Sequence, residues 1–207
     1  DFSAVRPHDG VHRPIRIVYA GKLYVGRWKV LAMLVKVLRR IGDADSPPIV
    51  LDIYTMDRVT SRQRRALHDG IFGNLKGSAS PEQLRQVYAE EADILLHVES
   101  MGLRHRYGTR YSVSTKVVDC MASGCAVMAI CPEMQEGYRL LAQAGAIVAS
   151  DEAALERVLR EVASNPGTLQ AVSGDIIRFG LQYLQGDIVQ AGLRKDIESI
   201  LGSCSDS

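Results

Sequence analysis

The sequence predicts an α/β protein with a doubly wound parallel sheet that carries helices on both faces. Short apolar runs without regular polar alternation take turns with longer segments of helical periodicity. Strands that are apolar throughout are typical of a parallel sheet that is covered on both sides. A length of 207 residues suits one domain with a sizeable core.

The first half of the chain alternates between strand and helix signals. The run "RIVYAG" (16–21) is rich in β-branched residues and ends in glycine, and "RWKVLAMLVKVLRRI" (27–41) has apolar residues at helical spacing. A second strand is expected at "PIVLDIYT" (48–55). The segment "SPEQLRQVYAEE" (80–91) has a Ser-Pro helix start, and "ADILLHVES" (92–100) follows as a third strand.

The second half continues the same alternation. The segment "STKVVDCMASG" (114–124) is typical of a capped helix that ends at Gly124, and "CAVMAIC" (125–131) is the next strand. A helix around "EGYRLLAQAG" and the short strand "AIVAS" come next. From Asp151 onward the pattern is helical, and the long C-terminal stretch could cover the sheet.

Charge and composition argue against several classes of protein. Lys and Arg number 25 against 24 Asp and Glu, so the formal net charge of +1 gives no general reason to expect nucleic acid as a partner. No apolar stretch reaches the roughly 20 residues that a membrane span needs, and the first residues lack the apolar core of a signal peptide. We therefore expect a cytoplasmic protein without a transmembrane segment.

The cysteines and histidines do not form a metal-ligand pattern. Four cysteines lack the paired short spacings of a zinc site, and we expect reduced, buried thiols; they are Cys120, Cys125, Cys131 and Cys204. Of the five histidines, His97 lies on an apolar strand and is expected to be packed, whereas His105 lies in an Arg-rich loop and is the one candidate for a ligand role. The sequence predicts no metal site.

Ligands of doubly wound sheets bind beyond the carboxyl ends of the strands. The segments that follow the expected strands are therefore the places to look for a site. They are "GKLYVGR" (21–27), the loop around Lys76, "ESMGLRHRYGTRYS" (99–112) and the residues after Cys131.

The first of these segments has the glycine spacing of a phosphate-binding P-loop, at Gly21 and Gly26, and Asp52 could serve as the acidic residue of a Walker B strand. However, Arg27 replaces the P-loop lysine. Trp28 replaces the serine or threonine and cannot bind magnesium. A P-loop NTPase is therefore the less favoured alternative.

Asp43 and Asp45 have the spacing of an Asp-x-Asp pair that holds a metal and a nucleotide-sugar diphosphate in another class of transferases. They follow a helix and precede Pro47 and Pro48, which places them at the amino ends of the strands. We expect a solvated turn there.

Lys116 and Asp119 share one face of a predicted helix. If Ser114 or Thr115 caps that helix, Lys116 lies in its first turn, where the helix dipole favours an anion. A lysine there suits a phosphate, and a carboxylate one turn further suits a ribose diol. An ordinary surface ion pair between the two residues is the alternative.

The order of "YAGKLYVGR", "LKGSASPEQLRQVYAEEADILLHVES" and "STKVVDCMASGCAVMAI" resembles the C-terminal, donor-binding domain of GT-B glycosyltransferases of the group 1 family. The likeness extends from about Ile15 to Ala149, with family-like helices afterwards. It implies a Rossmann-like fold and a retaining, metal-independent enzyme of the hexosyltransferase type. Such an enzyme needs no cofactor and takes its sugar from a nucleoside-diphosphate donor.

The resemblance also implies roles for particular residues. Two basic residues and a glycine after the first strand would hold the donor diphosphate, and a third basic residue, at the start of a helix, would contact a phosphate. These are Gly21, Lys22 and Arg27, and Lys116 after Ser114 and Thr115. Asp119 takes the place of a ribose-binding glutamate. The base-binding loop matches Lys76, Gly77 and Ser78, with Leu84 behind it.

The sequence departs from the family at the sugar contact. Many members carry a glutamate eight positions before the ribose-binding one, but Tyr111 stands there in this chain. Glu99 lies too far from Asp119 in the sequence to match this glutamate, so no residue is assigned to the sugar contact. The Arg-rich loop "SMGLRHRYGTRYSV" (100–113) could be a lid over the diphosphate or a solvated loop.

The resemblance divides the chain into residues 1–14, which match a linker from a missing N-terminal domain, the donor-binding domain at 15–203 and a tail at 204–207. The missing domain would bind the acceptor, a saccharide, lipid or small molecule, and could attach the enzyme to the inner face of the membrane. We expect the isolated chain to bind the nucleotide without transferring sugar. A non-catalytic nucleotide-binding regulatory or assembly module is the alternative from another class.

Overall fold

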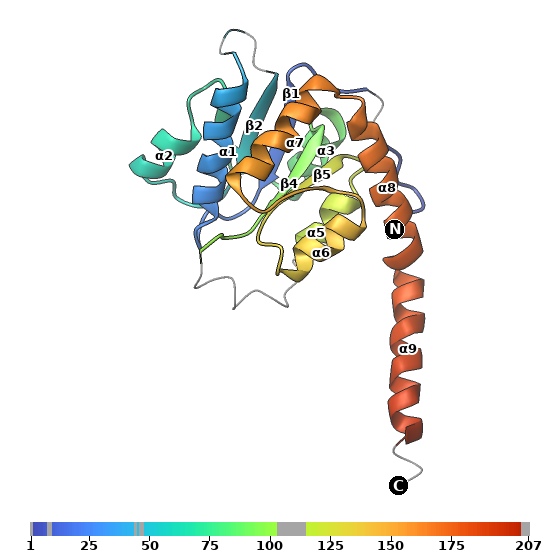
Figure 1. The fold of residues 1–207 in the computed structure, drawn as a ribbon. Helices are drawn as coiled ribbons and strands as arrows, with labels where there is room; N and C mark the ends of the chain where they lie inside the picture. Colours follow the sequence, from blue (N-terminus) through green and yellow to red (C-terminus); the bar gives the residue numbers. More distant parts are fainter. Residues whose placement is uncertain (1, 8–9, 44, 46–47, 103–114, 204–207) are drawn as a thin grey trace.

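The computed structural model describes residues 2–7, 10–43, 45, 48–102 and 115–203 and contains a six-stranded parallel sheet between two layers of helices (Figure 1). The strand order is β3-β2-β1-β4-β5-β6, so the order reverses between β1 and β4. This is the doubly wound, Rossmann-like arrangement that the sequence predicts. The strands are β1 (Ile15–Ala20), β2 (Ile49–Tyr54), β3 (Gly73–Gly77), β4 (Ile94–Val98), β5 (Ala126–Ile130) and β6 (Ile147–Ala149).

Helices cover both faces of this sheet. One face packs against α1 (Arg27–Ile41), α2 (Ser61–Leu67) and α7 (Glu152–Ser164). The other packs against α3 (Pro81–Glu90), α5 (Thr115–Met121), α6 (Glu136–Gln143) and α8 (Thr168–Tyr183). The last helix, α9 (Gly186–Ser203), extends away from the body of the domain (Figure 1).

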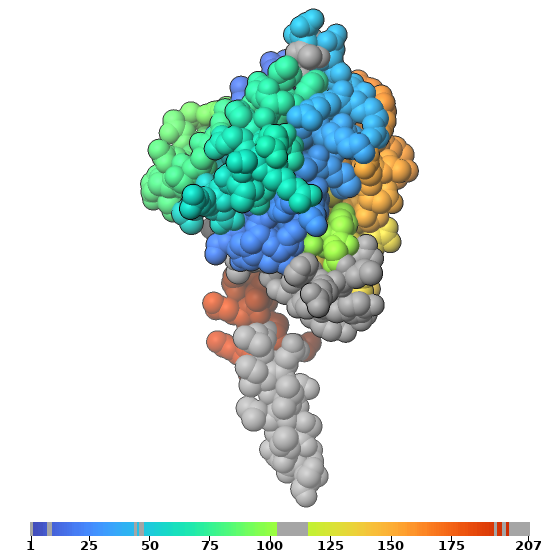
Figure 2. Space-filling view, turned by 90° about the vertical axis from the view of Figure 1, so that its left-hand side faces the viewer, coloured from blue at the N-terminus to red at the C-terminus, as the bar shows by residue number. Residues whose placement is uncertain are grey.

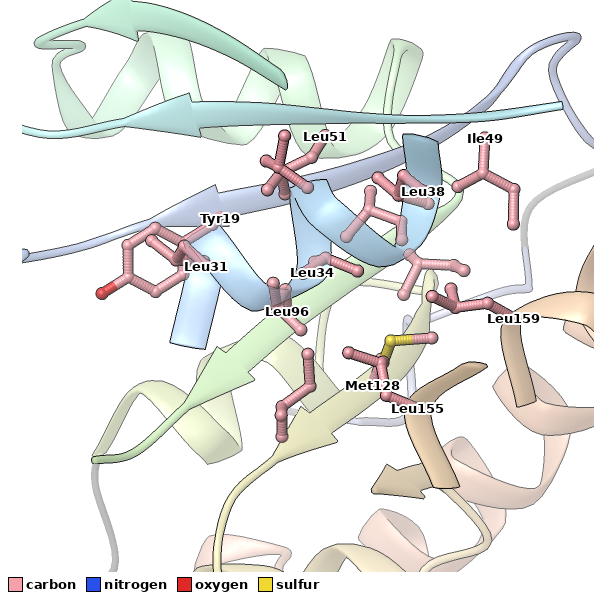
Figure 3. Close-up of a cluster of buried hydrophobic side chains, with 14 of the residues drawn as sticks. Tyr19, Leu31, Leu34, Leu38, Ile49, Leu51, Leu96, Met128, Leu155 and Leu159 are labelled. Carbon is pink, nitrogen blue, oxygen red and sulfur yellow. The ribbon is translucent and has the colours of Figure 1, made fainter. Parts of the chain in front are cut away.

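Neighbouring residues of each central strand enter different cores, which explains why the strands are apolar throughout. In β1, Ile17 belongs to the core beneath α1, whereas Val18 belongs to the core beneath α3. Both side chains are buried. Figure 3 shows the first of these cores, where Leu34 and Leu38 of α1 face the sheet.

Two elements were not expected from the sequence, and both lie at the β3 edge of the sheet. The strand β3 reads "GNLKG", in which two glycines and two polar residues hide the usual β signal. The helix α2 has seven residues and buries only Leu67 among them. An edge strand and a short peripheral helix bury little apolar surface, so their sequences need not show the periodicity of central elements.

The helix predicted at 114–124 ends earlier than expected. The helix α5 stops at Met121, and Gly124 takes the left-handed conformation in the turn that leads to β5. Cys125 and Cys131 flank that strand as buried thiols, and burial raises the pKa of both to about 12.

The N-terminal segment packs against the domain. Phe2 is buried against Gly180 of α8, and its backbone N–H donates to Gln185 Oε1 over 3.2 Å. Further along, the His12 N–H donates to Asp93 Oδ1 over 2.9 Å. The stretch expected as a linker is therefore held to the domain at both of these points.

Candidate functional site

The β1–α1 loop is held by hydrogen bonds to the neighbouring strand β2 and the loop after it. The Gly21 N–H donates to the Tyr54 carbonyl over 2.9 Å, and the Leu23 N–H donates to Asp57 Oδ2 over 2.6 Å. The Leu23 side chain is buried beneath the loop. These contacts fix the loop at the carboxyl end of β1.

The loop turns into α1 through Val25 and Gly26, which have φ angles of 58° and 82°. Positive φ is unusual for a β-branched residue such as Val25. The Arg27 and Trp28 amides donate to carbonyls of the same loop. A P-loop uses amides at this position to hold phosphates, so the loop geometry also argues against the NTPase alternative.

Gly21 lies where two side chains meet. A Cβ atom at this position would lie 2.8 Å from the Tyr19 hydroxyl and 3.0 Å from Lys116 Nζ. The Tyr19 hydroxyl donates to the Lys22 carbonyl over 2.6 Å, and Lys116 Nζ donates to the Ala20 carbonyl over 3.0 Å. The structure thus brings Lys116 of α5 to the loop that carries Gly21 and Lys22.

Arg27, the first residue of α1, forms an ion pair with Glu99. Its Nη2 atom lies 2.8 and 2.9 Å from the two carboxylate oxygens, and Nε lies 3.3 Å from Oε2. The Arg27 and Glu99 side chains are 24% and 13% exposed. Burial alone would lower the pKa of Arg27, but the hydrogen bond and the charge of Glu99 outweigh it and raise the pKa.

Glu99 was not among the residues predicted for the site. Its distance in sequence from Asp119 excluded it from the family pattern. Its position directly after β4 is nevertheless the kind of position where the fold places ligand contacts, and Glu99 begins the segment 99–112 that the sequence singles out for this reason. Next to it, Ser100 Oγ lies 2.8 Å from where a Cβ atom of Gly26 would be.

The three cations of this region influence one another. Burial lowers the pKa of Lys116, and the charges of Arg27 and Lys22 lower it further, while Cys120 and Asp119 act in the opposite direction. The charge of Lys116 is therefore close enough to those of Arg27 and Lys22 to be repelled by both. An anion bound among them would relieve that repulsion.

Two buried titratable side chains border the cations. Burial raises the pKa of Tyr19, so its phenol stays protonated at neutral pH. Burial lowers the pKa of His97 to about 4, and the nearby charges of Arg27 and Lys116 act in the same direction. His97 Nε2 lies 3.9 Å from Glu99 Oε1. His97 is packed, as expected, and it is neutral at pH 7.

All of these groups lie at the carboxyl ends of β1 and β4, where the strand order reverses. Figure 2 shows the blue residues of the β1–α1 region next to the yellow-green residues that follow β4. This junction is the usual ligand position in doubly wound folds. We refer to Lys22, Arg27 and Lys116 together as the cation cluster.

The predicted base-binding residues lie apart from the cation cluster, at the end of the edge strand β3. Lys76 Nζ is directed to Asp52 of β2, 3.6 Å from Oδ2. Gly77 has a φ of 84°, and its carbonyl accepts from the Thr55 N–H over 2.8 Å. Ser78 is exposed, and Leu84 is half-buried in α3.

Asp119 is exposed on α5, and its charge affects the pKa of Lys116. No ion pair joins Asp119 to Lys116 among the described residues, where Lys116 Nζ instead bonds to the Ala20 carbonyl. The surface ion pair considered from the sequence is therefore not formed. Ser114, Tyr111, His105 and most of the loop 100–113 lie outside the described residues, as does the side chain of Thr115.

Other features of the described residues lie away from this junction. Asp43 and Asp45 are exposed between α1 and β2, as expected for a solvated turn at the amino edge of the sheet. An open groove of about 740 Å³ lies between α6 and α8, and residues such as Gly145, Asp175 and Tyr183 line it. It contains no residue of the cation cluster.

Among the residues that the structure describes, no group of three His, Cys, Asp or Glu side chains could hold a metal ion. No helix formed by these residues is long and apolar enough to cross a membrane.

The fold is that of GT-B glycosyltransferases. The pneumococcal O-GlcNAc transferase GtfA, solved with UDP and GlcNAc, matches 95% of this chain with a TM-score of 0.60 and 17% identity. An O-GlcNAc transferase from Thermobaculum terrenum matches 94% with a TM-score of 0.64 and 19% identity. The α,α-trehalose 6-phosphate synthase of Burkholderia multivorans matches 93% with a TM-score of 0.61 and 13% identity.

The chain spans 38%, 37% and 44% of these three proteins, respectively. It therefore corresponds to one part of each of them, as expected for a C-terminal domain. No model of a protein family matches the sequence, and no curated relative matches it.

Proposed function

We propose that this chain is the donor-binding part of a glycosyltransferase and binds a nucleoside-diphosphate sugar. The observation that carries the proposal is that Lys116 reaches Gly21 at the junction of β1 and β4, where its positive charge lies near those of Lys22 and Arg27. The likeness in fold to glycosyltransferases supports it, and one of those structures contains UDP and GlcNAc.

The proposed reaction is retaining transfer of a hexosyl group without a metal ion. The bond between the anomeric carbon and the diphosphate breaks, and the departing nucleoside diphosphate takes the electron pair. An acceptor hydroxyl loses its proton and forms the new bond to the same carbon. Lys22, Arg27 and Lys116 would stabilise the negative charge that develops on it. Arg27, whose side chain is only 24% exposed, would interact more strongly with that charge than a fully exposed cation does.

The remaining contacts to the donor are assigned by the resemblance. Asp119 would accept hydrogen bonds from the ribose hydroxyls. The loop Lys76–Ser78, with Leu84 behind it, would contact the base. A nucleotide that spans from the cation cluster to this loop would lie across the carboxyl ends of β1, β2 and β3.

We assign the acceptor to another domain of the full enzyme, because this chain spans less than half of the solved glycosyltransferases it matches. The acceptor would be a saccharide, a lipid or a small molecule. We propose that the enzyme works in the cytoplasm or at the inner face of the membrane.

Calorimetric titration of the chain with UDP, GDP and ATP, each with and without magnesium, tests the proposal. We expect at least one nucleoside diphosphate to bind equally well in the absence of magnesium. Lys22→Ala should weaken this binding, whereas Lys36→Ala, which alters an exposed lysine of α1 that pairs with Glu152, should not. Binding of ATP alone, with a strict need for magnesium, or no binding at all would contradict the proposal.

A further inference from the structure

Glu99 places a negative charge inside a site that is otherwise suited to anions. It bonds to Arg27 through both carboxylate oxygens, and only 13% of its side chain is exposed. Because water screens a buried charge poorly, Glu99 acts on any anion that approaches the cation cluster. A site built only to bind phosphate would gain affinity from the loss of this carboxylate.

The geometry of the pair leaves Arg27 able to bind a ligand. Glu99 occupies the side of the guanidinium that carries Nε and Nη2. The guanidinium has five N–H donors, and two of them are on Nη1. Within the described ranges, no acceptor for Nη1 is found. Arg27 is thus held in one orientation by Glu99 and can still donate to a phosphate oxygen.

We propose that Glu99 is a positioning and charge-selecting residue, which favours the nucleoside-diphosphate sugar over the nucleoside diphosphate that the reaction releases. This inference rests on the proposed function. The diphosphate of the donor is esterified at both ends, whereas the released nucleotide has a terminal phosphate whose second pKa is about 6. Above that pH the released nucleotide carries one more negative charge than the donor.

The carboxylate of Glu99 repels every negative charge of the ligand, so it opposes the released nucleotide more strongly than the donor. The cation cluster attracts both ligands, and Glu99 reduces the extra attraction for the more highly charged one. The consequence for the enzyme is weaker retention of its product. A purely structural ion pair between α1 and the segment after β4 would not distinguish the two ligands.

The experiment compares Glu99→Gln with the unchanged chain. Glutamine has nearly the same shape and keeps an oxygen that can accept from Arg27, but it carries no charge. Dissociation constants are measured by calorimetry at about pH 8, where the terminal phosphate is ionised. The ligands are UDP, GDP and ADP, each beside its own glucose ester: UDP-glucose, GDP-glucose and ADP-glucose.

We expect Glu99→Gln to tighten binding of the nucleoside diphosphate more than binding of its glucose ester, which changes the ratio of the two dissociation constants by about three- to tenfold. Each ligand is compared between the variant and the unchanged chain, so its contacts through the base and the sugar cancel from the change in this ratio. Glu152→Gln is the matched control. It removes the same charge from α7, where Glu152 pairs with Lys36 and Arg40 of α1, and should leave the ratio unchanged.

The outcomes separate this inference from the proposed function. If the unchanged chain binds nucleotides and Glu99→Gln leaves the ratio as it was, Glu99 is only structural and the inference is wrong. If the unchanged chain binds none of the ligands, the proposed function is wrong. Thermal melting shows whether each variant folds. If Glu99→Gln does not fold, Glu99→Ser is used instead, because it removes the same charge with a smaller side chain.

Discussion

At the scale of single residues, the site depends on close approach and on mutual repulsion. Gly21 has no side chain, and this lets the Tyr19 hydroxyl and Lys116 Nζ lie close to the backbone at the end of β1. Lys116 bonds to the Ala20 carbonyl, and its positive charge lies near those of Arg27 and Lys22. The backbone contact positions Lys116, and the neighbouring cations make its ammonium group a favourable partner for an anion.

Lys116 and Asp119 should differ in the ligands that they affect. Lys116→Ala should weaken the binding of a nucleoside diphosphate by about 1.5–3 kcal/mol, the value of a charge-assisted hydrogen bond. It should hardly change the binding of a free nucleoside. Asp119→Ala should weaken the binding of both ligands alike, because both carry the ribose hydroxyls. Calorimetric titration of both variants with UDP and with uridine tests this prediction. If another base binds better, its nucleoside diphosphate and nucleoside are used instead. Equal and negligible effects on both ligands would exclude this helix from the site.

His97 should make folding stability depend on pH. Its pKa in the folded protein is about 4, below the ordinary value of 6.5, so the unfolded chain binds its proton first as the pH falls. The contribution of neutral His97 to the free energy of unfolding is therefore fully present above about pH 6.5. It is lost progressively as the pH falls towards 4. The loss should reach at most about 3 kcal/mol.

Urea unfolding at several pH values measures this effect. Between pH 7 and pH 4.5, the free energy of unfolding should fall less in His97→Gln than in the unchanged protein. His12→Gln, at a half-exposed histidine paired with Asp93, serves as the comparison. Parallel curves for the unchanged protein and His97→Gln would show that His97 does not titrate in this range.

At the scale of elements, the central strands and α1 differ from the elements at the edge. The strand β2 is buried along nearly its whole length, and α1 buries one continuous stripe against it. By contrast, β3 and α2 bury few side chains and were missed. The N-terminal segment behaves differently again, because one aromatic residue attaches an otherwise polar stretch to α8.

Phe2 should therefore contribute measurably to stability although it lies at the start of the chain. Phe2→Ala should lower the free energy of unfolding by about 3–5 kcal/mol, because only 2% of the residue is exposed. Arg6→Ala, at an exposed residue of the same segment, should cost less than about 1 kcal/mol. Denaturant unfolding of both variants tests this, and equal midpoints would show that the segment is not docked in solution.

At the scale of the whole molecule, the candidate site is a product of topology. The strands β1 and β4 are neighbours in the sheet, although 72 positions separate Arg27 from Glu99 and 96 separate Lys116 from Ala20. In the proposed function the sheet would form one wall of the site, and the acceptor would bind to another domain. Transfer requires both substrates to be held together in a fixed orientation.

The isolated chain should therefore bind a nucleotide but transfer no sugar. Incubation with UDP-glucose or GDP-glucose and a mixture of saccharide acceptors should yield no glycosylated product by mass spectrometry. The same protein preparation should bind the nucleotide in a parallel titration, which shows that the chain is folded. Formation of a glycosylated product by this chain alone would refute the prediction.

The sequence by itself determined the fold class, the order of the central elements and three of the basic residues now found together. Apolar runs of strand length and helical periodicity are local properties, so they can be recognised without knowing what packs against them. The loop after β1 and the helix after β4 were likewise found from their positions relative to strands.

Only the tertiary structure decided that Glu99 holds Arg27, that Lys116 bonds to the end of β1 and not to Asp119, and that Phe2 is buried against α8. Each of these contacts joins residues that are far apart in the chain and come from different elements. Their geometry follows from strand order and helix packing. A local sequence pattern cannot specify these contacts, because the same residue types are also found on exposed surfaces, where they make no such contact.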